Sequence, residues 1–245
     1  MSLKDQVVVI TGASTGIGAA LARRVAARGG RPVLAARRER ELTAVARECA
    51  GLAVVTDVTK RGDVKALLDA AVQQHGRVDV WVNNAGRGIS RTVLELTDDD
   101  VDEMMRINVK SALYGMQVAA AHMKPRRAGQ IVNVSSLLGR VPELPVRSAY
   151  SAAKHALNSL TADLRVELKD SGVTVTLVSP GITFTEFGLN ALHGGMDSRS
   201  LPGGQTADEV AAVIADAIET KALDVYTRPQ FKDRVVSYFS AMAGL

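Results

Sequence analysis

Tyr150 and Lys154 lie four residues apart in the run Tyr-Ser-Ala-Ala-Lys. In a helix, residues at this spacing share one face, so an ammonium group would sit beside a phenol. A neighbouring cation favours the phenolate, which makes Tyr150 a candidate for donating and recovering a proton near neutral pH. Lowering the phenol pKa by about 3 units requires roughly 4 kcal/mol, more than one lysine supplies, so we expect a second positive group beside Tyr150.

The Tyr-x-x-x-Lys spacing by itself is also typical of ordinary amphipathic pairing on a helix. Three upstream segments strengthen the chemical interpretation, because chance does not readily place all of them in this order. They are a glycine-rich turn at 11–18, the sequence Asn-Asn-Ala-Gly at 83–86, and a strand that ends in Ser135 and Ser136.

Short β-branched runs alternate with helical segments and predict the elements that position these residues. The predicted strands cover 7–10, 33–36, 53–58, 78–82, 130–134 and 173–178. The predicted helices cover 19–28, 39–49, 64–74 and 150–169. Continuously apolar strands between helices predict a Rossmann-like α/β fold, a doubly wound parallel sheet with helices on both faces. Such a sheet binds ligands outside the carboxyl ends of its strands, where the marked residues fall.

The composition, with 47% hydrophobic and 23% charged residues among 245, is that of a globular protein. No Pro/Ser-rich linker interrupts the pattern, so we expect one domain over 1–245. The net charge of +4 is spread among 26 acids and only 4% of residues are aromatic, which disfavours a nucleic-acid partner. The chain lacks a leader-like start and any run of 18 apolar residues, so we expect a cytoplasmic protein.

The remaining reactive side chains predict neither a disulfide nor a metal site. Cys49 lies in an apolar helical stretch, where a buried or half-buried thiol is expected. His75, His122 and His193 share no metal-ligand spacing, so no catalytic metal is predicted. Met104, Met105, Met116 and Met123 are interpreted as core or subunit-interface residues.

Gly12, Gly16 and Gly18 follow the first predicted strand. Glycines at this point let backbone and phosphate approach, and a helix amino terminus offers free N–H groups, so a pyrophosphate is the expected ligand. The turn taken alone is equally compatible with a tight connection. Its place directly after strand one favours a cofactor site, to which the intervening Ser14, Thr15 and Ile17 also belong.

The end of the second predicted strand reads Ala36-Arg37-Arg38. In dinucleotide folds this position carries an acid for a free ribose 2′-hydroxyl or an arginine for a 2′-phosphate. The missing acid and the two guanidiniums favour NADP(H), with NAD(H) as the other possibility. Glu39 and Glu41 partly neutralise the arginines, and a solvated turn stays open as the alternative.

These motifs together resemble the short-chain dehydrogenase/reductase family, from Thr11 to about Phe187. The resemblance implies that the Asn-Asn-Ala-Gly stretch supports the sheet and borders the adenine ribose. It also implies adenine contacts from the end of the third strand and nicotinamide contacts from a Pro-Gly segment. The cofactor-binding residues implied in this way are Asp57, Val58, Asn84, Ala85, Gly86, Tyr150, Lys154, Pro180, Gly181, Ile182, Thr183 and Thr185.

The same resemblance assigns catalytic roles to particular residues. The family's serine lies in Ser-x-x-Gly, which matches Ser136 rather than Ser135. Asn108 would take part in a proton relay through water, Tyr150 would be the acid, and Lys154 would activate it and hold the nicotinamide ribose. Without the resemblance, a helix kink is the simpler interpretation of Asn108, and helix capping that of Thr183 and Thr185.

Several segments depart from the family pattern or carry no readable code. The loop between Ser136 and Tyr150 contains Pro142 and Pro145, so its wall of the substrate pocket is particular to this chain. Residues 190–205 carry four glycines and no apolar period, which predicts a mobile loop and a candidate substrate lid. The carboxyl end, 228–245, lacks the glycine-rich ending of acyl-carrier-protein ketoreductases. Its apolar helical positions are interpreted as packing or subunit contact, ahead of membrane association.

The sequence therefore predicts NADPH-dependent reduction of a ketone or aldehyde to an alcohol, or the reverse. A non-catalytic NADP-binding redox sensor is the alternative from another class, although the complete Asn-Ser-Tyr-Lys set counts against it. An isomerase or dehydratase that uses the nucleotide transiently is a third hypothesis. Family resemblance implies a homodimer or homotetramer. Arg87, Arg91 and Arg147 are interpreted as solvated arginines, with recognition of an acidic substrate as the alternative.

Overall fold

A parallel sheet forms the centre of the computed structural model, which describes residues 2–142 and 144–244. Within these residues the sheet has seven strands in the order β3-β2-β1-β4-β5-β6-β9. Their bounds are β1 Val7–Thr11, β2 Arg31–Ala36, β3 Leu52–Val55, β4 Val80–Asn83, β5 Gly129–Val134, β6 Val173–Ser179 and β9 Asp224–Tyr226. Every neighbouring pair is parallel, so all carboxyl ends meet at one edge.

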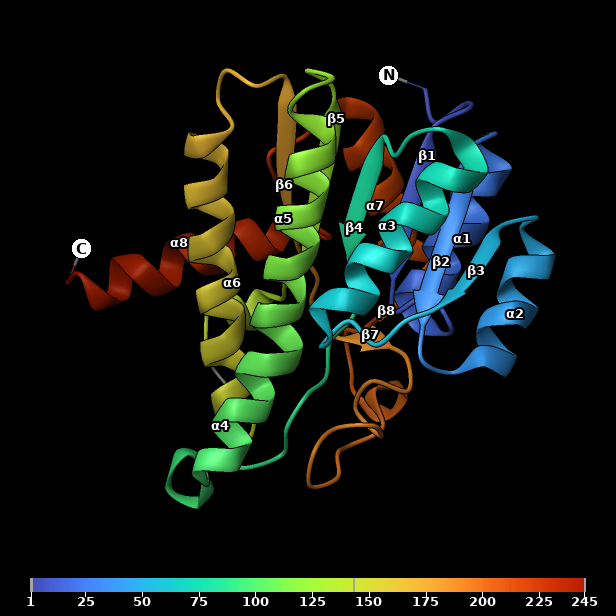
Figure 1. Ribbon diagram of the computed structural model, residues 1–245. Helices are drawn as coiled ribbons and strands as arrows, with labels where there is room; N and C mark the ends of the chain where they lie inside the picture. Colours follow the sequence, from blue (N-terminus) through green and yellow to red (C-terminus); the bar gives the residue numbers. More distant parts are fainter. Residues whose placement is uncertain (1, 143, 245) are drawn as a thin grey trace.

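Helices cover both faces of the sheet (Figure 1). One face packs against α1 (Gly16–Ala27), α2 (Glu39–Glu48) and α7 (Ala207–Thr220), and the other against α3 (Arg61–His75), α5 (Ser111–Met123) and α6 (Ser148–Glu167). Alternate residues of β1 feed the two cores: Val8 and Ile10 join the first, Val7 and Val9 the second. This arrangement confirms the predicted Rossmann-like fold and explains why the strands are apolar without alternation.

The predicted strands match the observed ones with small shifts at their ends. β3 ends at Val55, so the prediction of a strand to Val58 was too long. Residues 56–58 instead leave the sheet at its binding edge. β9 was not predicted, because its three residues are exposed or half-buried and carry no apolar pattern. Cys49 is buried, as predicted, and so are Met104, Met116 and Met123.

A π-helical stretch, Arg106–Lys110, joins α4 (Asp98–Met105) to α5. Two side chains there donate hydrogen bonds to main-chain oxygens. Ser111 Oγ donates to Ile107 O at 2.6 Å, and the Asn108 amide donates to Met104 O at 3.1 Å. The irregular turn therefore places Asn108 inside the protein, 1% exposed. This π-helical turn agrees with the helix-kink alternative for Asn108, and its role in a proton relay stays a prediction.

The chain after β6 folds back over the binding edge of the sheet. The short strands β7 (Thr183–Phe184) and β8 (Gln205–Thr206) pair in parallel and close the base of the intervening loop, which holds a 3₁₀ turn at Ser198–Ser200. The final helix, α8 (Pro229–Met242), extends away from the sheet (Figure 1) and contains no buried residue. Across 2–142 and 144–244, every helix is too short or too polar to cross a membrane.

Candidate active site

A cavity of about 760 Å³ opens at the carboxyl ends of the strands. It brings together nearly all of the residues singled out in the sequence, from the glycine-rich turn to the segment after β6. Among the candidate catalytic and cofactor-binding residues, Gly18 and Asn108 do not line it. It also includes three residues that the sequence did not indicate, Thr56, Thr59 and Arg234, and it includes Leu144, Met196 and Leu201 from the two loops that were expected to border the substrate. No sequence signal could have found Arg234, which reaches the cavity from α8.

The glycine-rich turn is shaped by close backbone approaches. Gly12 has φ +67°, and a Cβ there would lie 2.9 Å from the Ala85 Cα. Gly16 has φ +58°, also in the left-handed region that favours glycine. Gly18 packs against the turn on the side away from the cavity, and a Cβ on it would collide with the Gly12 carbonyl oxygen. Gly18 thus permits the turn to form and does not contact the cavity.

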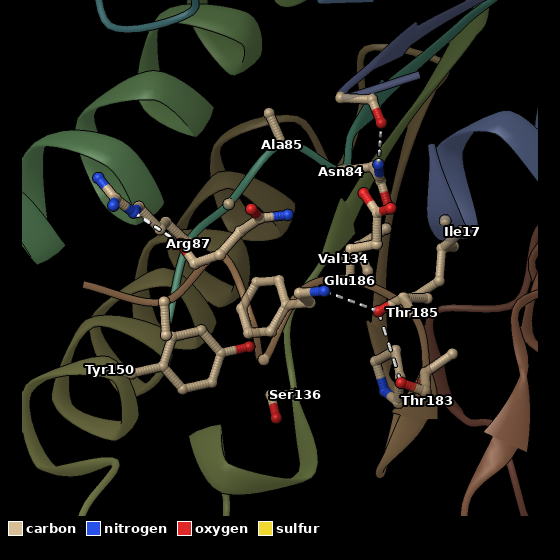
Figure 2. Close-up of a pocket in the computed structure, with 18 of the residues that line it drawn as sticks. Ile17, Asn84, Ala85, Arg87, Val134, Ser136, Tyr150, Thr183, Thr185 and Glu186 are labelled. Atoms are coloured by element: carbon tan, nitrogen blue, oxygen red, sulfur yellow. Dashed lines mark hydrogen bonds between the residues drawn. The ribbon is translucent and has the colours of Figure 1, made fainter. Parts of the chain in front are cut away.

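Thr11 joins the turn to the neighbouring strand end. Its hydroxyl donates to Val82 O at 3.3 Å and accepts from the main-chain N–H groups of Asn84 and Ala85, both at 3.0 Å. The Asn84 amide in turn donates to Thr11 O at 2.8 Å. The Asn-Asn-Ala-Gly segment therefore locks β1 to β4 while its main chain lines the cavity (Figure 2).

The amino terminus of α1 faces the cavity without a side-chain cap. Thr15 occupies the N-cap with extended backbone, but its side chain makes no cap hydrogen bond. The Thr15 hydroxyl instead accepts from Arg38 at 2.7 Å. The first turn of α1 contains no acid. The unpaired N–H groups of a helix start and its positive dipole end attract an anion.

Arg37 and Arg38 lie exposed at the end of β2, on the rim of the cavity. Arg38 is held by Thr15 and by Ser14 Oγ at 3.3 Å, and its guanidinium lies 3.7 Å from the Glu186 carboxylate. No acidic residue ends β2, since Ala36 occupies that position. This corner of the cavity is accordingly cationic.

Asp57 lies in the cavity wall just beyond the end of β3. Burial works to raise its pKa, but hydrogen bonds from the Thr59 hydroxyl and N–H, at 2.7 and 3.0 Å, together with the charge of Arg37, leave the pKa lowered. The carboxylate therefore stays ionised and its orientation is fixed.

Ser136, Tyr150 and Lys154 converge on the inner part of the cavity. Figure 2 shows the Tyr150 hydroxyl directed into the cavity near Ser136. Lys154 comes from the next turn of α6, and its Nζ lies 5.6 Å from the centre of the Tyr150 ring. The helical spacing predicted for the pair is thus observed, with Tyr150 7% and Lys154 3% exposed.

The two neighbouring serines have different surroundings. Ser135 Oγ donates to the Asn158 side chain at 2.5 Å, which ties β5 to α6. Ser136 begins a 3₁₀ turn, Leu137–Gly139, and its Oγ accepts from the Leu138 N–H at 3.1 Å, leaving the hydroxyl proton for another acceptor. The geometry therefore favours Ser136 over Ser135 as the serine that meets a substrate.

Burial dominates the protonation of the Tyr150–Lys154 pair. It raises the pKa of Tyr150 to about 12, although interaction with the Ser136 hydroxyl and the charge of Arg147 lower it in part. It lowers the pKa of Lys154 to about 8. The raised pKa of Tyr150 agrees with the expectation that one lysine does not bring this phenol toward neutrality and that a second positive group is needed.

Asn108 acts on the cavity wall from behind. Its Oδ1 accepts from the Arg87 N–H at 3.1 Å, and its Nδ2 donates to Arg87 O at 3.0 Å. A Cβ on Gly86 would lie 2.8 Å from Asn108 Oδ1, so the segment passes tightly over this amide. Asn108 thereby fixes the main chain that follows β4.

Thr183 and Thr185 line the opposite wall, and neither begins a helix. Thr183 lies in β7 and its hydroxyl donates to Gly181 O at 3.2 Å. The Thr185 hydroxyl accepts from the Phe187 N–H at 3.2 Å, which tightens the turn after β7. The helix-cap interpretation of these threonines is therefore wrong.

The loop between β7 and β8 lies against the far rim of the cavity. The Phe187 ring packs edge-on against Tyr150 with 5.5 Å between ring centres. The main chain of Leu192 pairs with the 88–90 segment through hydrogen bonds of 2.8 and 3.0 Å. His193 Nε2 lies 2.5 Å from Asp100 at the start of α4. Residues within the predicted loop 190–205 are therefore attached to the main body at several points.

The sequence was compared with protein-family models and with known proteins. The family model for the short chain dehydrogenase matches residues 6–193. An uncharacterized oxidoreductase of Staphylococcus epidermidis is 30% identical over 229 residues, covering 93% of this chain and 98% of the relative.

Two solved structures share the fold throughout. A short chain dehydrogenase/reductase from Burkholderia phymatum, in complex with NAD, is 29% identical with a TM-score of 0.87, covering 96% of this chain and 93% of the other. A short-chain dehydrogenase from Sphingobium yanoikuyae, in complex with NADPH, is 29% identical with a TM-score of 0.84, covering 98% and 94%. The protein belongs to the short-chain dehydrogenase family and is an oxidoreductase.

Proposed function

We propose that the protein interconverts a ketone or aldehyde and the corresponding alcohol with NADP(H), using Tyr150 as the proton donor and acceptor. The observation that carries this proposal is the convergence of Tyr150, Ser136 and Lys154 in the cavity that also contains the glycine-rich turn. Membership of the oxidoreductase family and the nicotinamide-bound relatives support a cofactor of this class.

The residues present fit a dinucleotide. The glycines at 12 and 16 let the backbone approach a pyrophosphate, and the uncapped start of α1 supplies N–H donors for it. Asp57 and Val58 would border the adenine, and Lys154 with Tyr150 would hold the nicotinamide ribose. The Pro180–Thr185 segment would meet the carboxamide.

The side chains divide the proton chemistry among themselves. The bound nicotinamide supplies or accepts the hydride. Ser136 Oγ donates a hydrogen bond to the carbonyl oxygen, and the Tyr150 hydroxyl protonates that oxygen as negative charge develops on it. Lys154 stabilises the phenolate that remains. In the reverse direction the phenolate removes the proton from the alcohol. Because burial opposes phenolate formation, a second positive group beside Tyr150 remains part of the proposal.

Preference for NADP(H) is proposed from the cationic corner at the end of β2. Arg38 is already oriented by Thr15 and Ser14, and Arg37 lies exposed beside it. A 2′-phosphate would form charge-assisted hydrogen bonds with these guanidiniums. Glu186, 3.7 Å from Arg38, competes weakly because both side chains are exposed.

We also propose that residues 190–205 form a lid over the substrate end of the cavity. Five of these residues line the cavity: Asn190, Ala191, Met196, Ser198 and Leu201. The pairing of β7 with β8 holds the two ends of the loop together. The lid would exclude water from the reacting carbonyl.

The test is a titration of the protein with NADPH and with NADH separately, in which nicotinamide fluorescence reports binding. The oxidation of each cofactor is then measured with a panel of ketones and aldehydes. Tighter NADPH binding with turnover supports the proposal. Tight NADPH binding without turnover on any carbonyl would favour a redox sensor. Tighter NADH binding would show that Arg37 and Arg38 do not meet the ribose phosphate.

A further inference from the structure

Arg147 places a guanidinium in the cavity one helical turn before Tyr150. It is the N-cap residue of α6, half-buried, and lines the cavity. One of its donors is used within the protein, because Nη1 donates to Ile89 O at 3.0 Å. The charge of Arg147 also acts on Tyr150 and offsets part of the rise that burial causes in its pKa. The interpretation of Arg147 as a solvated arginine is therefore wrong.

Arg147 has no acidic partner among residues 2–142 and 144–244, where no carboxylate lies within 4 Å of its guanidinium. Arg91 and Arg140, which lie outside the cavity lining, pair with Asp100 and Asp224, both at 2.7 Å. Arg87 lines the cavity and, like Arg147, has no carboxylate partner among the described residues. A half-buried guanidinium without a carboxylate costs desolvation energy that a bound anion would offset.

The surroundings of Arg147 belong to the substrate end of the cavity. A Cβ on Gly88 would lie 2.7 Å from Arg147 Nη1 and 3.1 Å from the Phe187 ring. Phe187 packs in turn on Tyr150. The guanidinium, the phenol and the aromatic ring of the loop thus enclose one small region.

Arg87, the other arginine of this rim, is arranged differently. Its Nε donates to Asn190 O at 2.9 Å, and Figure 2 shows its guanidinium directed away from the Tyr150 hydroxyl. Arg87 therefore holds the loop, whereas Arg147 is the arginine that stands beside the proton donor.

We propose that the substrate is a short oxo acid, or the matching hydroxy acid, whose carboxylate pairs with Arg147 while its carbonyl faces Tyr150 and Ser136. This inference rests on the proposed function and names its substrate class. Arg147 and Tyr150 lie three residues apart at the start of α6 and both line the cavity, so one small substrate can meet both side chains. Arginine suits the role because its planar fork matches a carboxylate.

The experiment compares 2-, 3- and 4-oxopentanoate, each with its methyl ester, as substrates for the protein with NADPH. These acids share one chain length and move the carbonyl stepwise away from the carboxylate. The expected result is a kcat/KM ratio of acid to ester well above one for at least one of the three. A ratio at or below one for all three would overturn the inference, while turnover of the esters would leave the reductase function standing.

The variant Arg147→Gln separates charge recognition from a structural role. We expect the acid-to-ester ratio to fall about 10- to 100-fold, because a charge-assisted pair is lost for the acid alone. Damage to the fold or to Tyr150 would lower kcat/KM for the acid and the ester together and leave their ratio unchanged. An unchanged ratio would overturn the inference. Arg47→Gln, on the exposed surface of α2, is the matched control and should keep the ratio.

Two further outcomes remain decisive. If the acid-to-ester ratio falls in Arg87→Gln and not in Arg147→Gln, the substrate carboxylate pairs with Arg87, which would overturn the inference. If no acid or ester is turned over although NADPH binds, the proposed function fails. Calorimetric binding of the oxopentanoates to the NADP complex of Tyr150→Phe then tests the anion site by itself, and binding that does not depend on Arg147 contradicts it.

Discussion

The buried ammonium group of Lys154 donates a hydrogen bond of 3.0 Å to the main-chain oxygen of Val134. Val134 is the last residue of β5, so this contact anchors the lysine at the binding edge of the sheet. An ammonium group has three donors, and this one fixes its position beside Tyr150. The orientation of the pair therefore depends on the strand as much as on the spacing within α6.

Burial of this lysine predicts a characteristic pH dependence of stability. The pKa of Lys154 is lowered from 10.5 to about 8, so between these pH values the unfolded chain binds more protons than the folded one. The free energy of unfolding contributed by this group therefore rises with pH across that window, by about 3 kcal/mol. Below pH 8 both states carry the proton and its contribution is constant.

Urea unfolding of the wild type and Lys154→Met between pH 7 and 10.5 measures this term, since the other titrating groups are common to both. We expect the difference, wild type minus variant, to grow in favour of the wild type as the pH rises. Parallel curves would show that Lys154 titrates normally in the folded protein.

The positive φ of Gly12 predicts that Gly12→Ala lowers stability by about 1–3 kcal/mol, because the added Cβ is strained and meets the Ala85 backbone. Gly62→Ala is the matched control. Gly62 lies in the first turn of α3 with open space around its Cβ, so the same change should raise stability by about 0.4–1 kcal/mol. Thermal unfolding of both variants checks the contrast, and equal effects would contradict the role given to Gly12.

Arg38→Gln should weaken NADPH binding about 10- to 100-fold and change NADH binding less than about threefold, because only NADPH carries a 2′-phosphate. Arg37→Gln should have the smaller effect, since Arg38 is oriented by Thr15 and Ser14. Fluorescence titration with each cofactor gives both constants. An equal loss for the two cofactors would place Arg38 elsewhere than at the phosphate.

His193→Asn should loosen the proposed lid, because the contact with the buried Asp100 holds it against α4. We expect several-fold faster trypsin cleavage after Arg199, identified by mass spectrometry of the fragments. His75→Asn, at the end of α3, is the control and should cleave at the wild-type rate. Unchanged cleavage in His193→Asn would mean that this contact does not hold the loop.

The sequence predicted the sheet and the inner site well because both depend on local patterns. Apolar runs gave β1, β2 and β4 through β6 to within a few residues, and helical spacing brought Tyr150 and Lys154 together as expected. β9 was missed because its three residues form a strand only by pairing with β6.

The sequence could not predict how deeply each side chain is buried, or which residues far apart in the chain make contact. The extent to which burial raises the Tyr150 pKa could not be predicted, because desolvation depends on every element packed around the phenol. The cavity surroundings of Arg147 and the approach of Arg234 depend on loops and on α8, whose placement no periodicity records. The same holds for the contact between His193 and Asp100, which are 93 residues apart.

The most direct test of the proposed chemistry is turnover by Tyr150→Phe, measured as NADPH oxidation with the best carbonyl substrate of the wild type, together with NADPH binding. The variant should bind NADPH within about threefold of the wild type and lose about 10²–10⁴ in kcat, the usual contribution of a positioned proton donor. Turnover at the wild-type rate would contradict the assignment of Tyr150 as the proton donor.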